Sequence, residues 1–107
     1  MTLNAAAFQR IIYAPTDAAG QKVFNRSLSQ AEYINIVAFK ANANNATILS
    51  YRIYQVENGR RTAIASLDAA TFAYWHRKVD GTREYTYHIV AVNNEPREGD
   101  AAVIVVR

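Results

Sequence analysis

The sequence predicts an all-β protein in which about seven short strands form a two-sheet antiparallel β-sandwich. Apolar or aromatic residues stand at every second position from Tyr85 to Ala91 and share one strand face, which is the pattern of a strand with that face buried. Runs rich in β-branched and aromatic residues recur along the chain, separated by turn formers. One such turn, Asn58-Gly59, is a strong hairpin signal, because a type I′ turn needs positive φ at both central residues.

The first 13 residues are expected to be an N-terminal extension or linker, with the domain spanning residues 14–107. Apolar residues recur in this segment at helical spacing, at Leu3, Ala7, Phe8, Ile11 and Ile12. Asn4 suits the N-cap of a short helix. An upstream linker or an additional edge strand explains the same residues equally well, so both alternatives stay open.

The strands that follow are bounded by turn and loop residues. In chain order we expect them over residues 21–24, 32–40, 49–54, 62–67, 71–76, 79–93 and 101–106. Residues 16–20 carry turn formers, so the first strand is expected to be an edge strand interrupted by a kink. In the second strand, residues 32–40, Ile34 and Ile36 point to one face whereas Val37 and Phe39 point to the other. This indicates a β-bulge or burial on both faces.

The turn before Tyr85 places this residue at a sheet-to-sheet corner. We expect its ring to be buried and its hydroxyl to bond backbone near Gly81 or Val79. Inward parity also predicts a single inter-sheet core that contains Phe39, Tyr51, Ile53, Tyr87, Ile89 and Ile104.

Several of these segments together carry a family resemblance. They are Pro15, residues 48–54, residues 71–74 and the run Val79-x-Gly81-Thr82-x-x-Tyr85-x-Tyr87-x-Ile89-x-Ala91-x-Asn93. On these residues, the chain from 14 to 107 resembles a fibronectin type III domain of the bacterial extracellular type, which implies an immunoglobulin-like sandwich. Two positions depart from the family pattern: Phe39 stands where a tryptophan is usual, and Asp80 where a proline is common. Trp75 is expected to supply part of the missing inter-sheet packing.

Composition excludes several kinds of chemistry. The chain has no cysteine, which removes disulfides, thiolate nucleophiles and cysteine-based metal sites. Its formal net charge is +3, but acidic and basic residues are interspersed without a basic stripe, so no nucleic-acid partner is expected. No apolar run approaches the ~18–20 residues of a membrane span.

The N-terminal residues lack the features of a secretory signal. Either the protein stays in the cytoplasm, or the sequence is a segment of a longer secreted chain. Because domains of the family it resembles usually occur as one module among several, we expect an extracellular or cell-surface location as part of a longer chain, with the cytoplasm left open.

Candidate catalytic and metal-binding residues are few. His76 and His88 are the only histidines, and neither has acidic neighbours in a metal-site or catalytic pattern. The glycines do not cluster, and no serine stands in a Gly-x-Ser-x-Gly motif. The acidic loop at residues 95–100 matches no calcium-loop spacing. We therefore expect no enzymatic activity, no cofactor and no metal.

Binding, where it occurs, is expected at the loops. The resemblance points to the loop between the last two strands as a partner-binding loop, with Asn93, Asn94, Glu95, Arg97 and Glu98 as its candidate residues. Asn93, Asn94 and Arg97 are expected to be its exposed tips, and the turn at residues 42–46 to be a second candidate. Three rings without a core role, Tyr13, Tyr54 and Trp75, leave glycan stacking open.

The resemblance implies a non-catalytic module that serves as a spacer or a protein-interaction platform in a larger, bacterial, secreted or surface protein. Its partners would be another protein or neighbouring domains of the same chain. The alternative is a carbohydrate-binding accessory module of a glycan-processing protein.

Overall fold

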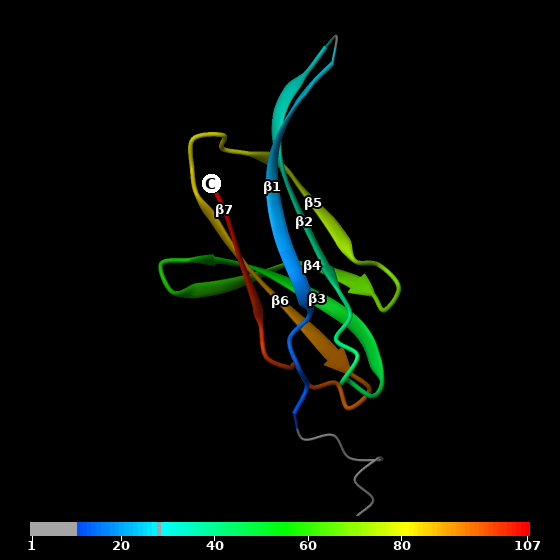
Figure 1. The fold of residues 1–107 in the computed structure, drawn as a ribbon. Helices are drawn as coiled ribbons and strands as arrows, with labels where there is room; N and C mark the ends of the chain where they lie inside the picture. The colour runs from blue at the N-terminus through cyan, green and yellow to red at the C-terminus, as the bar shows by residue number, and fades with distance from the viewer. Residues whose placement is uncertain (1–10, 28) are drawn as a thin grey trace, which may run out of the picture.

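The computed structural model describes residues 11–27 and 29–107, and these residues form seven β-strands. In chain order the strands are β1 (Thr16–Arg26), β2 (Ala31–Lys40), β3 (Ile48–Glu57), β4 (Arg60–Asp68), β5 (Ala73–Val79), β6 (Tyr85–Asn93) and β7 (Ala102–Val106). All neighbouring pairs are antiparallel. The β1-β2 hairpin projects beyond the rest of the sandwich (Figure 1).

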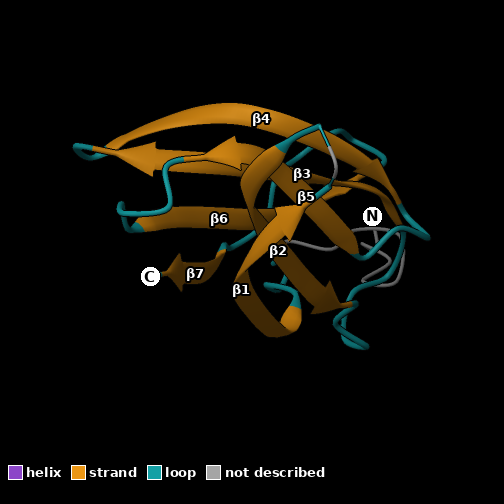
Figure 2. Cartoon of the chain, turned by 90° about the horizontal axis from the view of Figure 1, so that it is seen from above, coloured by secondary structure: helices purple, strands orange, loops and turns teal. Residues whose placement is uncertain are grey.

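The strands form two sheets that pack face to face (Figure 2). One has the order β1-β2-β5 and the other β4-β3-β6-β7. The prediction of a seven-stranded, two-sheet antiparallel sandwich is therefore confirmed.

The inward side chains of both sheets meet in one hydrophobic core. All six residues predicted from parity belong to it: Phe39, Tyr51, Ile53, Tyr87, Ile89 and Ile104. The ring of Phe39 lies 4.8 Å from that of Tyr51 and 5.7 Å from that of Phe72, measured between centroids. Phe39 thus fills the position where the family that this chain resembles usually has a tryptophan.

Trp75 does not take part in that packing, and the expectation that it would is wrong. Its side chain is 56% exposed. In the β2-β5 register Trp75 stands opposite Ile36, whereas the neighbouring Val37 and Tyr74 form the pair that faces the core. The parity of β5 therefore turns the indole to the outer face of the three-stranded sheet.

The sandwich begins earlier than the expected boundary at residue 14. Ile12 is 3% exposed and packs in the core cluster, and its carbonyl accepts a 3.0 Å hydrogen bond from the backbone N–H of Asp100. Residues 12 and 13 are therefore part of the packed domain. Most of the expected helix, linker or additional edge strand over residues 1–13 lies outside the described residues, and residues 11–13 form neither a helix nor a strand.

The irregularities predicted in the first two strands are present as bulges. The β1-β2 register shifts between Thr16 and Ala19, where Asp17 has φ 50°, so residues 16–20 belong to a bulged strand and not to a separate turn. In β2 the buried positions change parity between Ile34 and Asn35, and the register with β5 shifts at the same place.

Two local predictions are confirmed in detail. Asn58 and Gly59 have φ values of 53° and 73°, as a type I′ turn requires. Tyr85 is buried, and its hydroxyl accepts a 2.8 Å hydrogen bond from the backbone N–H of Asp80, between the two residues predicted as its partners.

Candidate interaction surface

The loop between β6 and β7 is a compact extension of their hairpin. Val92 pairs with Glu98, and the N–H of Gly99 donates to the carbonyl of Ala91 at 2.9 Å, so residues 94–97 form the tip. All four residues of the tip are exposed. Asn94, Glu95 and Arg97 therefore lie at the surface.

Asn93 is not an exposed tip, and that expectation is wrong. The residue is 6% exposed, and its Oδ1 accepts hydrogen bonds from the backbone N–H groups of Glu95 at 3.0 Å and Arg97 at 2.8 Å. Its own N–H donates to the carbonyl of Arg97 at 3.0 Å. Asn93 therefore holds the shape of the loop from within, as asparagines do in Asx-turns.

The second predicted loop, residues 42–46, lies at the same end of the sandwich. The side-chain amide of Asn45 donates to the carbonyl of Tyr13 and accepts from its N–H, and Asn42 donates to the carbonyl of Ala14. Because Ile12 contacts the β6-β7 loop through Asp100, the segment 12–14 joins both loops. The two predicted binding loops therefore frame one end surface.

Glu98 turns from the β6-β7 loop onto the outer face of the four-stranded sheet. Its Oε2 accepts hydrogen bonds from Arg52 Nη1 and the Tyr54 hydroxyl, both on β3. Its Oε1 lies 4.0 Å from Arg61 Nη1 of β4. Burial would raise the pKa of the Glu98 carboxyl, but the hydrogen bonds from Tyr54 and Arg52 outweigh it and hold the pKa below its ordinary value.

Arg61 completes this polar group, which we call the Glu98 cluster: Arg52, Tyr54, Arg61, His88 and Glu98. The Arg61 guanidinium carbon lies 4.4 Å from the centroid of the Tyr54 ring. Its Nε donates to His88 Nδ1 at 3.2 Å, which leaves the histidine neutral with its proton on Nε2. Burial and the neighbouring Arg61 charge both lower the pKa of His88.

His76 lies in a buried polar chain that sequence reasoning missed. Asn35 Nδ2 donates to the Tyr87 hydroxyl at 2.8 Å, and that hydroxyl lies 2.6 Å from His76 Nδ1. Burial raises the pKa of Tyr87 to about 12 and lowers that of His76. The three residues come from β2, β5 and β6, so no local pattern connects them; the buried asparagine between apolar neighbours in β2 was the available signal.

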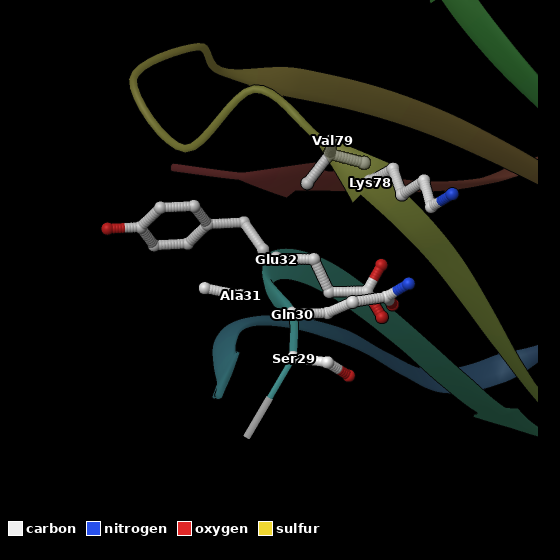
Figure 3. Close-up of a pocket in the computed structure, with 7 residues that line it drawn as sticks. Ser29, Gln30, Ala31, Glu32, Lys78 and Val79 are labelled. Carbon is white, nitrogen blue, oxygen red and sulfur yellow. The ribbon is translucent and has the colours of Figure 1, made fainter. Parts of the chain in front are cut away.

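A surface pocket of about 490 Å³ lies at the opposite end of the molecule, beside the β1-β2 hairpin (Figure 3). It is lined by Ser29, Gln30, Ala31, Glu32, Tyr33, Lys78 and Val79. Glu32 pairs there with Arg77, and this contact lowers the pKa of the Glu32 carboxyl. Lys78, the next residue of β5, has a positive φ of 55°. The ion pair between Glu32 and Arg77 therefore joins β2 to the end of β5.

Of the three rings left without a core role, two are exposed. Trp75 is 56% and Tyr13 40% exposed, whereas Tyr54 is half-buried beneath Arg61. Across the described residues, no three His, Cys, Asp or Glu side chains gather as a metal site would require. No helix in the same part of the chain is long and apolar enough to cross a membrane.

Comparison with known proteins identifies the fold. The structure of FN3tt mut is similar over 88% of this chain and 96% of its own, with 16% identity and a TM-score of 0.67. A Fn3-like protein from Clostridium thermocellum is similar over 89% and 94%, with 20% identity and a TM-score of 0.60. The chain therefore has a fibronectin type III fold, as the sequence resemblance implied.

A second kind of similar structure is larger. Pectate lyase Pel3 from Pectobacterium carotovorum is similar over 83% of this chain but only 26% of its own, with 10% identity and a TM-score of 0.58. The similarity therefore concerns one part of that enzyme. No family model matches the sequence, and no curated protein matches it.

Proposed function

We propose that this chain is a non-catalytic module that acts as a spacer or protein-interaction platform within a larger bacterial protein, secreted or displayed on the cell surface. One observation carries the proposal: the same fold matches nearly the whole of two small proteins and about a quarter of a pectate lyase. A fold with that distribution is used as a unit inside longer chains.

The direction of the strands supports a spacer role. Ile12 bonds Asp100 beside the Asn93 end of β6, whereas Val106 of β7 pairs with Tyr85 at the other end of β6. The nine residues of β6 separate the two ends by roughly 30 Å. A chain that enters and leaves through these ends passes along the full length of a rigid sandwich.

The hydrogen bonds of the two histidines and of Glu98 support a non-catalytic role. His76 is bonded to Tyr87, His88 to Arg61, and Glu98 to Arg52. Each of these groups is held by a structural partner, and none is paired with a serine nucleophile as a hydrolase requires.

The proposal is tested with the purified chain. We expect no turnover of polygalacturonate, of nitrophenyl esters or of nitrophenyl phosphate, and a melting temperature that is unchanged by EDTA. The control is the native chain in concentrated urea, which gives the signal of an unfolded preparation. Turnover that is abolished by His76→Gln or Glu98→Gln, in a variant that still melts cooperatively, would contradict the non-catalytic role.

The spacer role has its own measurement. Because the chain lacks cysteine, Ile11→Cys with Arg107→Cys allows a dye at each end of the sandwich. We expect one narrow energy-transfer population with the dyes about 30 Å or more apart. A broad population under native conditions would contradict a rigid spacer.

The second candidate function is a carbohydrate-binding accessory module, and Trp75 favours it. The indole is 56% exposed on the outer face of the three-stranded sheet. Beside it runs a row of exposed alanines, in which Ala38 pairs with both Ala19 and Ala73. An open indole above small side chains offers a planar apolar surface to a sugar ring.

Trp75 also provides the test, because it is the only tryptophan of the chain. A polysaccharide that stacks on the indole changes the intrinsic fluorescence, and Trp75→Ala removes binding while Trp75→Phe retains part of it. Fluorescence and titration calorimetry that show no binding of polygalacturonate, xylan or soluble cellulose derivatives would argue against this role.

A further inference from the structure

The outer face of the four-stranded sheet combines the Glu98 cluster with an exposed apolar edge. The registers place Tyr54 of β3, His88 of β6 and Val103 of β7 in one row across the sheet. Thr86 and Val105 follow in the next row. Val103 is 59% and Val105 40% exposed, and β7 is the edge strand of its sheet.

The Arg61 side chain crosses this face from the opposite edge. It starts on β4, passes over the Tyr54 ring at 4.4 Å and reaches His88 on β6 at 3.2 Å. His88 is the direct partner of Val103, and neighbouring strands lie about 4.8 Å apart. The guanidinium therefore lies beside the residue that pairs with Val103, at the side of the face that carries the exposed valines.

The cluster contains more positive charge than its own carboxylate neutralises. Arg52 and Arg61 share Glu98, and His88 is neutral because its Nδ1 accepts from Arg61. Arg61 Nη1 is 4.0 Å from Glu98 Oε1, beyond hydrogen-bond distance, and among the described residues the Arg61 Nη groups donate no hydrogen bond. The side chain is 39% exposed, so these donors face solvent.

Such a group is suited to a carboxylate. A planar guanidinium binds a carboxylate through two parallel hydrogen bonds, and Arg61 is already held in one orientation by Tyr54 and His88. Pre-organisation lowers the entropy cost of binding. Val103 and Val105 add an apolar contact surface beside it.

We propose that this face binds an acidic, extended segment of a partner protein, with a carboxylate on Arg61 and a neighbouring apolar side chain on Val103 and Val105. The inference rests on the proposed interaction role and names the partner chemistry. Charge complementarity selects an acidic partner. The apolar neighbours select a peptide over an anionic glycan, because Arg61 covers the ring of Tyr54 and the valines offer no planar surface to a sugar.

The test uses capped peptides and the full chain. The probes are an octapeptide of two Glu-Ser-Val-Ser repeats (the Glu-Val peptide), in which Glu and Val point to the same side of an extended chain, the matching peptide with Gln in place of Glu (the Gln-Val peptide) and an oligogalacturonate of similar length. Each is titrated by calorimetry and by NMR with the Arg Nε–H signals observed. We expect saturable binding of the Glu-Val peptide, with shifts at Arg61, His88 and Val103, and weaker binding as the salt concentration rises. The Gln-Val peptide is expected to bind at least about tenfold more weakly.

The variants are matched by position. Arg61→Gln is expected to weaken the affinity for the Glu-Val peptide about tenfold or more, which is the effect of losing one charge-assisted hydrogen-bonded pair. Arg60→Gln, the adjacent exposed arginine outside the Glu98 cluster, is the control and is expected to leave binding unchanged. Val103→Thr tests the apolar contact and is also expected to weaken binding. Melting curves of all three establish that each variant is folded.

Three results would overturn the inference: no saturable binding up to millimolar peptide, equal binding by Arg61→Gln and the native chain, or tighter binding of the oligogalacturonate on this face. Peptide binding that maps to residues 94–97 and is insensitive to Arg61→Gln would overturn this inference but not the proposed interaction role. The proposed interaction role would then still stand, because its loops would carry the binding.

Discussion

The Tyr85 hydroxyl accepts a 2.8 Å hydrogen bond from the backbone N–H of Asp80, five residues earlier in the chain. The turn between them is closed by a second bond, from the N–H of Arg83 to the carbonyl of Asp80. The ring is buried in the core and the hydroxyl bonds the turn, so Tyr85 fixes the turn before β6 to the hydrophobic core.

Tyr85→Phe is therefore expected to lower the free energy of unfolding by about 1–3 kcal/mol, because the backbone N–H of Asp80 loses its acceptor at a part-buried site while the ring stays in place. Urea denaturation measures the effect. The control is Tyr33→Phe: the Tyr33 side chain is 40% exposed, and its hydroxyl makes no hydrogen bond to a described residue. Equal midpoints for Tyr85→Phe and the native chain would show that the corner bond contributes nothing.

The corner was predictable because its determinants are local. A turn, a tyrosine and strict alternation stand within fifteen consecutive residues, and the Asn58-Gly59 turn is specified by two. The polar contacts of Glu98 and Asn35 were not predictable, because they join residues that are far apart in the sequence. Glu98 meets Arg52 across 46 residues and Asn35 meets Tyr87 across 52, so only the pairing of the sheets brings them together.

Parity alone also misjudged single positions. The bulge at Ile34 and Asn35 moves the buried positions of β2 by one residue, which places an asparagine in the core. Asn93 reads as a polar loop residue, yet the loop closes around its side chain. The Asn93 amide replaces missing backbone partners in the loop, and the Asn35 amide bonds the Tyr87 hydroxyl. A sequence pattern of hydrophobicity registers neither role.

Phe39→Ala is expected to destabilise the domain by about 3–5 kcal/mol, because it leaves a cavity between Tyr51 and Phe72 in the core. Chemical denaturation with tyrosine and tryptophan fluorescence gives the value. Phe24→Ala is the comparison, since Phe24 is 52% exposed and contacts the ring of Tyr33 on the projecting hairpin. Near-native stability of Phe39→Ala would mean that β2 packs differently from the structure.

Ile12→Ala tests where the domain begins. Ile12 is 3% exposed in the core cluster, whereas the side chain of its neighbour Ile11 is 54% exposed. We expect Ile12→Ala to cost about 2–5 kcal/mol of unfolding free energy and Ile11→Ala much less. Thermal melts and urea midpoints of the pair provide the comparison. Similar losses in both, or in neither, would restore a boundary at residue 14.

The last prediction concerns pH and the contact between His76 and Tyr87. Tyr87 accepts from Asn35, and among the described residues His76 Nδ1 is the other group within hydrogen-bond distance of its hydroxyl. We therefore assign the hydroxyl hydrogen to His76 Nδ1, which must be unprotonated to accept it. Protonation turns Nδ1 into a donor and leaves the Tyr87 hydrogen without an acceptor in the core. Burial lowers the pKa of His76 in the folded protein below its ordinary value, 6.5, and the rings of Tyr74, Tyr85 and Tyr87 surround the imidazole.

The sign follows from proton linkage. Below about pH 6.5 the unfolded chain binds a proton at His76 that the folded chain resists, so stability falls as the pH falls, by at most ~1.4 kcal/mol per pH unit for one group. Urea midpoints between pH 7.5 and about 5.5 measure this slope, above most of the range in which the lowered carboxyl pKa values act. His88 contributes with the same sign, because its pKa is also lowered. His76→Phe should therefore remove part of the slope and His88→Gln the rest, and an unchanged slope in His76→Phe would show that the imidazole titrates freely in the folded protein.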